Sequence, residues 1–368
     1  METKETYGRF SGNGAMHQRG GGNLLSYPKS LSEKSLKKKY QDAGLSENKV
    51  LFMKDLCLAC MNLYGAIHAT DIWDVYRELS GKAEVPQLHR KELYSALGIF
   101  RREDLPYYVF EADEIYSEEP RSDKYKLLAS KQLVGSGYGK FTNIYVLLES
   151  SSDKPYFVPG NLMEYKDPAP DERRQKLIGW LSKLSCTQTE YESRYGKTYP
   201  CAYTGKKLGE FSFISQEDDY DLRYQRGEIR ANKGNPKLAE ELEAELNSMN
   251  AAERLVRDYT WRSHLGNVTP TKTIQYFLDD LTEMGVLLTE KQSDYLLQSL
   301  PDYHNHLHLW CNCGWTPEEL ARERFSSGQA MPRIQFGPGM QKAFSDGSMD
   351  REELIRMIKE MGIDVIDN

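Results

Sequence analysis

One short segment, residues 303–320, constrains the fold of this chain more than any other. It holds three of the seven histidines, two of the six cysteines and two of the five tryptophans. Thr316 followed by Pro317 is typical of a helix start, with Thr as the N-cap and Pro in the first turn. Glu319, three residues after Thr316, has the spacing of a capping box. The segment therefore predicts the end of one helix, a tight turn at Gly314 and the capped start of another helix.

The same segment carries the residue types that bind zinc. If residues 290–310 form one helix, His304 and His308 lie four residues apart on one face, with Cys311 near that face. A His-x3-His-x2-Cys arrangement can ligate zinc, with Cys313 or a carboxylate completing the tetrahedron. One hypothesis is therefore a metal-dependent hydrolase with zinc as its cofactor. The other is that the tryptophans belong to the core and that the histidines lie at a surface or an interface.

The bulk composition fits a globular protein of more than one domain. The 368 residues are 39% hydrophobic and 28% charged, and no apolar run approaches the ~20 residues of a membrane span. The glycine-rich stretch from Met1 to Tyr27 does not resemble a signal peptide. Six cysteines without framework spacing suit a reducing compartment. We therefore expect a cytoplasmic protein with no membrane partner.

Structure is expected to begin near residue 46. Residues 1–45 are rich in Gly, Ser and Lys and bury too little apolar surface to offset the entropy of ordering, so we expect a disordered arm. Ser46 is an N-cap for a helix whose apolar residues recur at helical spacing. Two further helices are expected, ending near Leu79 and Phe100.

A β-hairpin is expected after the third helix, from strand-like runs at 107–110 and 114–117. Three helices and a hairpin are the plan of a winged-helix module, so residues 46–118 are predicted to form a winged-helix-like N-terminal module. The net charge of −7 argues against broad electrostatic capture of nucleic acid. If the module nevertheless binds nucleic acid, the residues expected to contact phosphates are Lys82, Arg90 and Lys91.

The rest of the chain predicts two more domains. Residues 119–236 are expected to form a mixed α/β middle domain, with a helix over 124–134 and a second hairpin from runs at 143–149 and 154–158. Residues 237–368 predict a helical C-terminal domain. The expected fold class is therefore α+β and mainly helical.

Two motifs are better explained without a site. Cys57 and Cys60 form a CxxC pair inside the apolar stripe of the first helix, which favours buried cysteines over redox or metal chemistry. The glycine-rich run at 135–142 lacks the first Gly of a phosphate loop, and Phe141 stands where such a loop has Ser or Thr. A turn is the better account of that run.

The pattern Asn305-x4-Trp310-x-Asn312-x-Gly314-Trp315-Thr316-Pro317 resembles a segment of uncharacterised bacterial proteins associated with SEC-C motifs. In those proteins an Asn on a long helix precedes a Trp, and a Gly-aromatic-Thr-Pro turn opens the next helix. Residues 62–67 and 107–116 are also similar to them. The resemblance covers about a quarter of the chain.

This resemblance implies a helix-turn-helix joint rather than a metal site. The SEC-C motif itself is a Cys-x-Cys zinc knuckle that is completed by a later Cys and a His or Cys. No Cys follows Cys313 in this chain, so the knuckle is missing. The function of the family is largely unknown.

The favoured functional hypothesis is a non-enzymatic regulatory or interaction protein that acts through protein or nucleic-acid binding. The net negative charge of the chain makes a protein partner at least as plausible as nucleic acid. One alternative is the metal-dependent hydrolase centred on His304, His308 and Cys311. Another is a mobile-element inhibitor of a host defence complex, which the sequence neither supports nor excludes.

Overall fold

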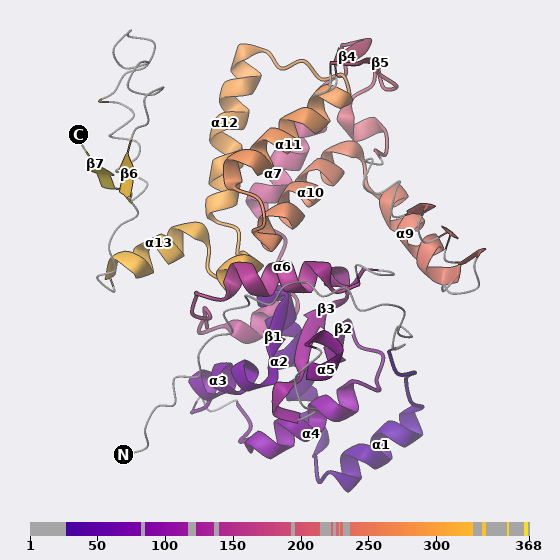
Figure 1. The fold of residues 1–368 in the computed structure, drawn as a ribbon, viewed down its shortest axis with the longest axis vertical. Helices are drawn as coiled ribbons and strands as arrows, with labels where there is room; N and C mark the ends of the chain where they lie inside the picture. Colours follow the sequence, from indigo (N-terminus) through magenta and orange to yellow (C-terminus); the bar gives the residue numbers. More distant parts are fainter. Residues whose placement is uncertain are drawn as a thin grey trace.

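The computed structural model of the chain describes residues 27–81, 85–116, 123–135, 140–192, 196–213 and 236–326, with short pieces between 222 and 230 and in the C-terminal region. The described residues are mainly helical with small sheets, which confirms the α+β, mainly helical fold class. Two groups of elements are seen in Figure 1. We call residues 27–166, in its lower half, the N-terminal unit, and residues 172–305, in its upper half, the helical unit.

Four helices build one side of the N-terminal unit: α1 (Glu33–Asp42), α2 (Glu47–Tyr64), α3 (Ala69–Leu79) and α4 (Arg90–Phe100). Helix α2 begins as predicted, with the Ser46 hydroxyl accepting a hydrogen bond from the backbone N–H of Lys49. Cys57 and Cys60 are fully buried in this helix. Burial raises the pKa of Cys57 to about 12 and that of Cys60 well above its ordinary value, so both thiols are core residues.

Helix α1 lies inside the stretch that was expected to be a disordered arm. The expectation of disorder over residues 1–45 is wrong for this helix, while residues 1–26 lie outside the described part of the chain. Ser32 caps α1, and Leu36 and Leu45 are buried in the core of the N-terminal unit. Two buried leucines suffice to dock a short polar helix whose own composition predicts no stable structure.

A three-stranded antiparallel sheet packs against these helices, in the order β1 (Ala66–His68), β3 (Leu127–Ser130), β2 (Tyr107–Phe110). Its side chains alternate between two cores. Ile67, Val109 and Leu128 lie in register and face the core formed by α2, α3 and α4. Ala66, Phe110, Leu127 and Ala129 face the opposite side, where α6 (Thr142–Ser151) covers the sheet.

The predicted hairpin of 107–110 with 114–117 is wrong in its second strand. Residues Ala112–Ile115 form the short helix α5, and β2 pairs with β3 instead. The physical reason is a local cap: the backbone N–H of Glu111 donates to the carboxylate of Glu114 at 2.8 Å. This bond closes a helical turn where the alternating residue pattern predicts a strand.

Two predictions for the middle of the chain are also wrong. The predicted helix at 124–134 contains strand β3, and the predicted hairpin at 143–149 and 154–158 contains helix α6. Ile144 and Leu147 explain the helix, because they lie three residues apart and are both buried against the sheet. Packing of this apolar face overrides the β-propensity of the residues in between.

The helical unit consists of α7 (Glu172–Leu181), α9 (Pro236–Ser248), α10 (Ala251–Leu265), α11 (Pro270–Glu283), α12 (Glu290–Asn305) and the hairpin β4 (Glu190–Glu192) with β5 (Thr198–Pro200). Its core holds Tyr259, Phe277 and Tyr303. Thr269 caps α11 ahead of Pro270 as predicted, and the N–H of Thr289 donates to Gln292 at the start of α12.

The remaining elements are short. They are α13 (Pro317–Ser326), the parallel pair β6 (Arg333–Gln335) and β7 (Asp364–Ile366), and the 3-10 turns η1 (Asp123–Tyr125), η2 (Lys131–Leu133), η4 (Leu162–Lys166), η5 (Leu208–Glu210) and η6 (Trp310–Asn312). Within the predicted helical C-terminal domain, residues 350–361 lie outside the described residues except for Glu352.

The described side chains group differently from the predicted divisions at 118 and 236. Leu128 and Leu162 belong to the core of the N-terminal unit, whereas Leu177 and Phe213 belong to that of the helical unit. Leu127 and Ile144 belong to a third core, between the sheet and α6, so the described residues of the predicted middle domain are shared among three cores.

Candidate functional site

The two units meet at residues 306–316, which we call the joint segment. Helix α12 ends at Asn305, η6 follows, and α13 begins at Pro317. Cys313 and Gly314 both have positive φ, 51° and 86°, which turns the chain back on itself. As predicted, Thr316 and Glu319 form a capping box, with N–H to side-chain distances of 3.0 and 3.1 Å. The predicted helix end, tight turn and capped start are therefore confirmed.

Trp310 is the centre of this joint. Its indole N–H donates to the backbone oxygen of Asn62 at 3.0 Å, and its ring fills the space beside Gly65, where a Cβ would lie 2.5 Å from it. On the other side the ring stacks on His264 at the end of α10, with centroids 4.5 Å apart. One side chain thus bridges α2 of the N-terminal unit and α10 of the helical unit.

The turn that follows Trp310 adds backbone contacts to the same joint. A Cβ at Gly314 would lie 2.8 Å from Leu63, so the backbone of the turn packs directly on α2. The N–H of Phe157 donates to the oxygen of Cys313 at 3.0 Å, and the indole N–H of Trp315 donates to Pro155. The joint segment is therefore tied to the N-terminal unit at several independent points.

His308 uses both ring nitrogens inside the joint. Its Nδ1 lies 2.7 Å from the backbone oxygen of Gly314, which can only accept, so Nδ1 carries the proton and donates. In the neutral ring Nε2 then accepts from the Tyr165 hydroxyl at 2.9 Å. The ring also stacks on Phe157, with centroids 5.5 Å apart. This hydrogen bonding assigns His308 an orienting and packing role.

The structure does not bring together the three predicted zinc ligands. His304 packs edge-on against Tyr259, and the thiol of Cys311 donates to the backbone oxygen of Ser263. Burial lowers the pKa of His304 and raises that of Cys311 to about 11. Among the described residues, no group of three or more His, Cys, Asp or Glu side chains is placed to hold a metal ion.

His264 is a partly buried histidine, and we expect it to make the joint sensitive to acid. Burial lowers its pKa from 6.5 to about 3. Between these two values the unfolded state takes up a proton that the folded state does not, so stability falls as the pH falls. We expect the wild type to lose about 1.4 kcal/mol per pH unit in this window relative to a His264→Gln variant.

Urea denaturation of both chains at pH values between 6.5 and 3 measures this difference. Asp280 titrates in the same range, since burial raises its pKa to about 6, but it is present in both chains and cancels in the comparison. Parallel pH profiles of the wild type and the variant would contradict the burial of a neutral His264.

Two of the three residues predicted to contact nucleic acid, Arg90 and Lys91, lie at the start of α4 and are exposed. The third, Lys82, lies outside the described residues. The guanidinium carbon of Arg90 lies 5.9 Å from the ring centres of both Trp73 and Tyr94. A cation is thus held beside two aromatic rings at one edge of the N-terminal unit.

A second exposed region, which the sequence did not predict, lies on the helical unit. It contains Trp180, Tyr191, Tyr199, Leu287 and Tyr295, and we call it the distal face. The hairpin β4–β5 and the start of α12 lie at the end of the molecule away from the N-terminal unit (Figure 1). The loop that bears Leu287 joins α11 to α12 and is bonded to the base of the hairpin through Gly285.

The distal face is aromatic and partly acidic. Leu287, Tyr199 and Tyr295 are 64%, 43% and 39% exposed. Trp180 pairs with Tyr295 at a centroid distance of 4.7 Å, and Tyr191 stacks on Tyr199 at 5.7 Å. Burial and then the charge of Glu283 raise the pKa of Tyr191, which places a carboxylate beside the hairpin.

The strand of Tyr191 also carries negative charge. Glu190 and Glu192 flank Tyr191 in β4, are both exposed, and lie on the opposite face of the strand. The only sequence signal for this region is the tyrosine content of 185–209, because the five residues of the distal face come from α7, β4, β5, α12 and the loop between α11 and α12. Their proximity follows from tertiary structure.

Comparison with known proteins gives no family assignment. No protein-family model matches the chain, and no curated protein or solved structure is significantly similar to it. Within the described ranges, no helix has the length and apolar content that crossing a membrane requires.

Proposed function

We propose that this chain is a non-enzymatic interaction protein that binds a protein partner through its distal face. The observation that carries the proposal is the exposure of Leu287, Tyr199 and Tyr295 next to the aromatic pairs Trp180–Tyr295 and Tyr191–Tyr199. Tyr and Trp are enriched at protein interfaces, because they supply a large rigid contact area with a polar tip.

The charges beside the face define the chemistry of the partner. Glu283 favours a partner segment that carries Arg or Lys among apolar residues, and Glu190 and Glu192 add negative charge on the opposite face of the hairpin. An Arg guanidinium of the partner can stack on the exposed tyrosines, with the charge of Glu283 nearby. The joint segment supports this role, since it holds the distal face in a fixed position relative to the N-terminal unit.

A variant that carries both Leu287→Asp and Tyr295→Asp tests the proposal. We expect it to recover at least about tenfold less of the partner than the wild type in affinity purification from the native cell, because charges replace two exposed apolar contacts. Leu51→Asp is the matched control, since Leu51 is 61% exposed but lies on α2. Equal recovery with the distal-face and control variants would count against the proposal.

A second candidate function, nucleic-acid binding by a winged-helix-like module, is favoured by two observations. The elements run α2, β1, α3, α4, β2, α5, η1, β3 with the strand order β1-β3-β2, and apart from the insertion of α5 and η1 between β2 and β3 this order supports a winged-helix-like arrangement. In that arrangement α4 is the recognition helix, and Arg90 and Lys91 lie at its start, where groove contacts are made.

Electrophoretic mobility shift at low salt tests this second candidate. If the module binds DNA or RNA, the double variant Arg90→Ala with Lys91→Ala should weaken binding by roughly tenfold, because two phosphate contacts are lost. Lys291→Ala is the control, since Lys291 is an exposed lysine on α12 of the helical unit. Absence of a shift by the wild type at low salt would remove nucleic-acid binding.

A further inference from the structure

Strand β2 lies at one edge of the three-stranded sheet, and no other strand of the described residues pairs with its outer side. Unpaired N–H and C=O groups on such an edge can pair with another chain. At Val109, which lies opposite Leu128 in the register, both backbone groups bond to side chains instead of to β3. The backbone of β2 at Val109 is therefore covered by side chains.

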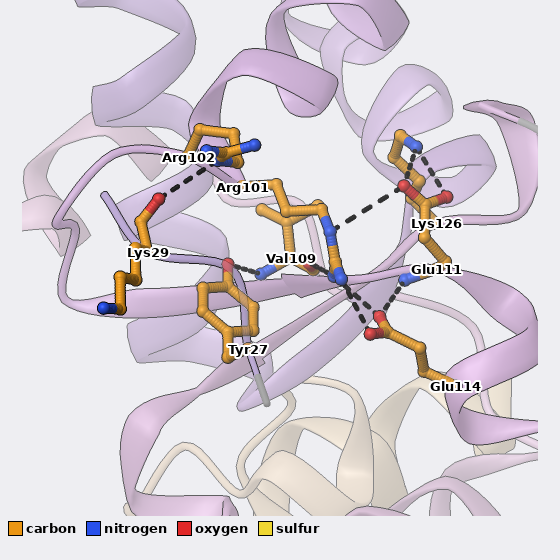
Figure 2. A network of polar contacts seen from close by, with 8 residues as sticks. All are labelled: Tyr27, Lys29, Arg101, Arg102, Val109, Glu111, Glu114 and Lys126. Carbon is orange, nitrogen blue, oxygen red and sulfur yellow. Dashed lines mark hydrogen bonds and ion pairs between the residues drawn. The ribbon is translucent and has the colours of Figure 1, made fainter. Parts of the chain in front are cut away.

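Two side chains cover the edge at Val109, as Figure 2 shows. The Val109 N–H donates to the hydroxyl oxygen of Tyr27 at 3.0 Å. The Val109 carbonyl accepts from the guanidinium of Arg101 at 2.7 Å. A phenol and a guanidinium thus occupy the positions that the backbone groups of an added strand would take.

Arg101 is a fixed part of the N-terminal unit. It donates two hydrogen bonds to the carboxylate of Glu114, at 2.6 and 2.7 Å, and lies 3.9 Å from Glu111. Glu111 is held in turn by two bonds of 2.7 Å from Lys126 (Figure 2). This ion-pair network holds Arg101, one of the two side chains that cover the β2 edge, against α5 and the start of β3.

Tyr27 is the other side chain that covers the edge, and it comes from a short extended segment, residues 27–31. Two hydrogen bonds between the backbone of this segment and Arg102 hold it. The side-chain Nε of Arg102 donates to the Lys29 carbonyl at 3.1 Å, and the backbone carbonyl of Arg102 accepts from the Leu31 N–H at 2.8 Å. The Tyr27 ring lies 4.6 Å from Tyr108, with the guanidinium of Arg101 above it at 5.1 Å. The ring of Tyr27 is therefore in contact with both an aromatic ring and a cation.

We propose that the β2 edge is a docking site for an extended peptide segment of a partner protein, and that residues 27–31 occupy this site in the present structure. The occupant seen here defines the chemistry of the ligand. It presents an acceptor to the Val109 N–H and an aromatic ring to Arg101 and Tyr108.

The site lies on the N-terminal unit and is distinct from the distal face. An aromatic extended segment from another chain competes with Tyr27 for the same donor and the same ring contacts. Binding in trans therefore requires release of residues 27–31, and a substitution that weakens their hold should raise the affinity for such a segment.

A labelled synthetic peptide with the sequence of residues 24–32 is the probe, because it carries Tyr27 in its own context. We expect the full-length Tyr27→Ala chain to bind it at least about tenfold more tightly than the wild type does. A peptide with Ala in place of its tyrosine is the control and should bind neither chain. Equal affinity of the two chains for the tyrosine peptide would overturn the proposal.

Amide hydrogen exchange gives an independent readout in a chain whose packing is preserved. Tyr27→Phe keeps the ring and removes the hydroxyl that accepts from Val109. We expect at least about tenfold faster exchange at the Val109 amide and no change at Leu128 in the middle strand. Unchanged exchange at Val109 would overturn the proposed role of Tyr27. Neither measurement involves the distal face, so a negative result in either one leaves the proposed function untouched.

Discussion

Replacing Trp310 by Ala lowers the free energy of unfolding by about 3–5 kcal/mol, the range for removing a buried Trp from a core. The side chain is 6% exposed, packs against Gly65 and His264, and donates to Asn62. Its loss leaves a cavity between the two units and an unpaired carbonyl at Asn62. Urea denaturation followed by circular dichroism measures the effect.

Trp315→Ala is the matched control for this variant. Trp315 lies in the same segment and makes one indole hydrogen bond to Pro155, but it is only half-buried. Its replacement is expected to cost about 1–2 kcal/mol, because less apolar area is lost. Equal losses from the two substitutions would contradict the central position of Trp310 in the joint.

Glu114→Ala is expected to lower the free energy of unfolding by about 3 kcal/mol, since breaking a buried pair leaves the other charge without a partner. The side chains of Arg101 and Glu114 are 14% and 8% exposed, and two short hydrogen bonds join them. Glu114 also accepts from the N–H of Glu111 at the start of α5, so its removal uncaps that helix. Chemical denaturation at pH 7 measures the loss.

Arg102→Ala is the control for the network. Arg102 lies next to Arg101 in the sequence, but its side chain makes a single exposed hydrogen bond, to the carbonyl of Lys29. Its replacement should cost about 1 kcal/mol or less. A loss from Glu114→Ala no larger than that from Arg102→Ala would contradict the view that the network of Figure 2 holds the N-terminal unit together.

Helices with strong start signals were predictable from the sequence. Ser46, Thr269 and Thr316 each cap a helix, because a side-chain oxygen satisfies a backbone donor that has no partner within the helix. These signals are local and need no knowledge of the rest of the fold. Helix α1 escaped prediction because its stability comes from docking Leu36, not from its own composition.

The strands were poorly predictable, since their signals are tertiary. Strands β1 and β3 have three and four residues, too few for a periodic pattern to stand out. Strand β3 is recognised as a strand only through its pairing with β1 and β2 on both sides. Helix α6 was mistaken for strand because its identity depends on the sheet face that it covers.

The histidine and cysteine residues of the joint segment show that a spacing typical of metal ligands does not fix where the side chains lie. The spacing of His304 and His308 puts them on one face only if the helix continues past both. Helix α12 tolerates Pro301 but ends at Asn305, so His308 lies beyond it and faces Tyr165. The tryptophans and the capping box of the same segment gave the correct structure, because their roles depend on local geometry.

Site-specific photo-crosslinking at Tyr295 tests the central claim, that a partner binds the distal face, most directly. A photoreactive phenylalanine analogue replaces Tyr295 in one chain and Leu51, which is more exposed than Tyr295, in a control chain, and both are irradiated in the native cell. We expect one discrete crosslinked protein from position 295 and none from position 51. The same crosslinked protein at both positions, or none at position 295, would contradict it.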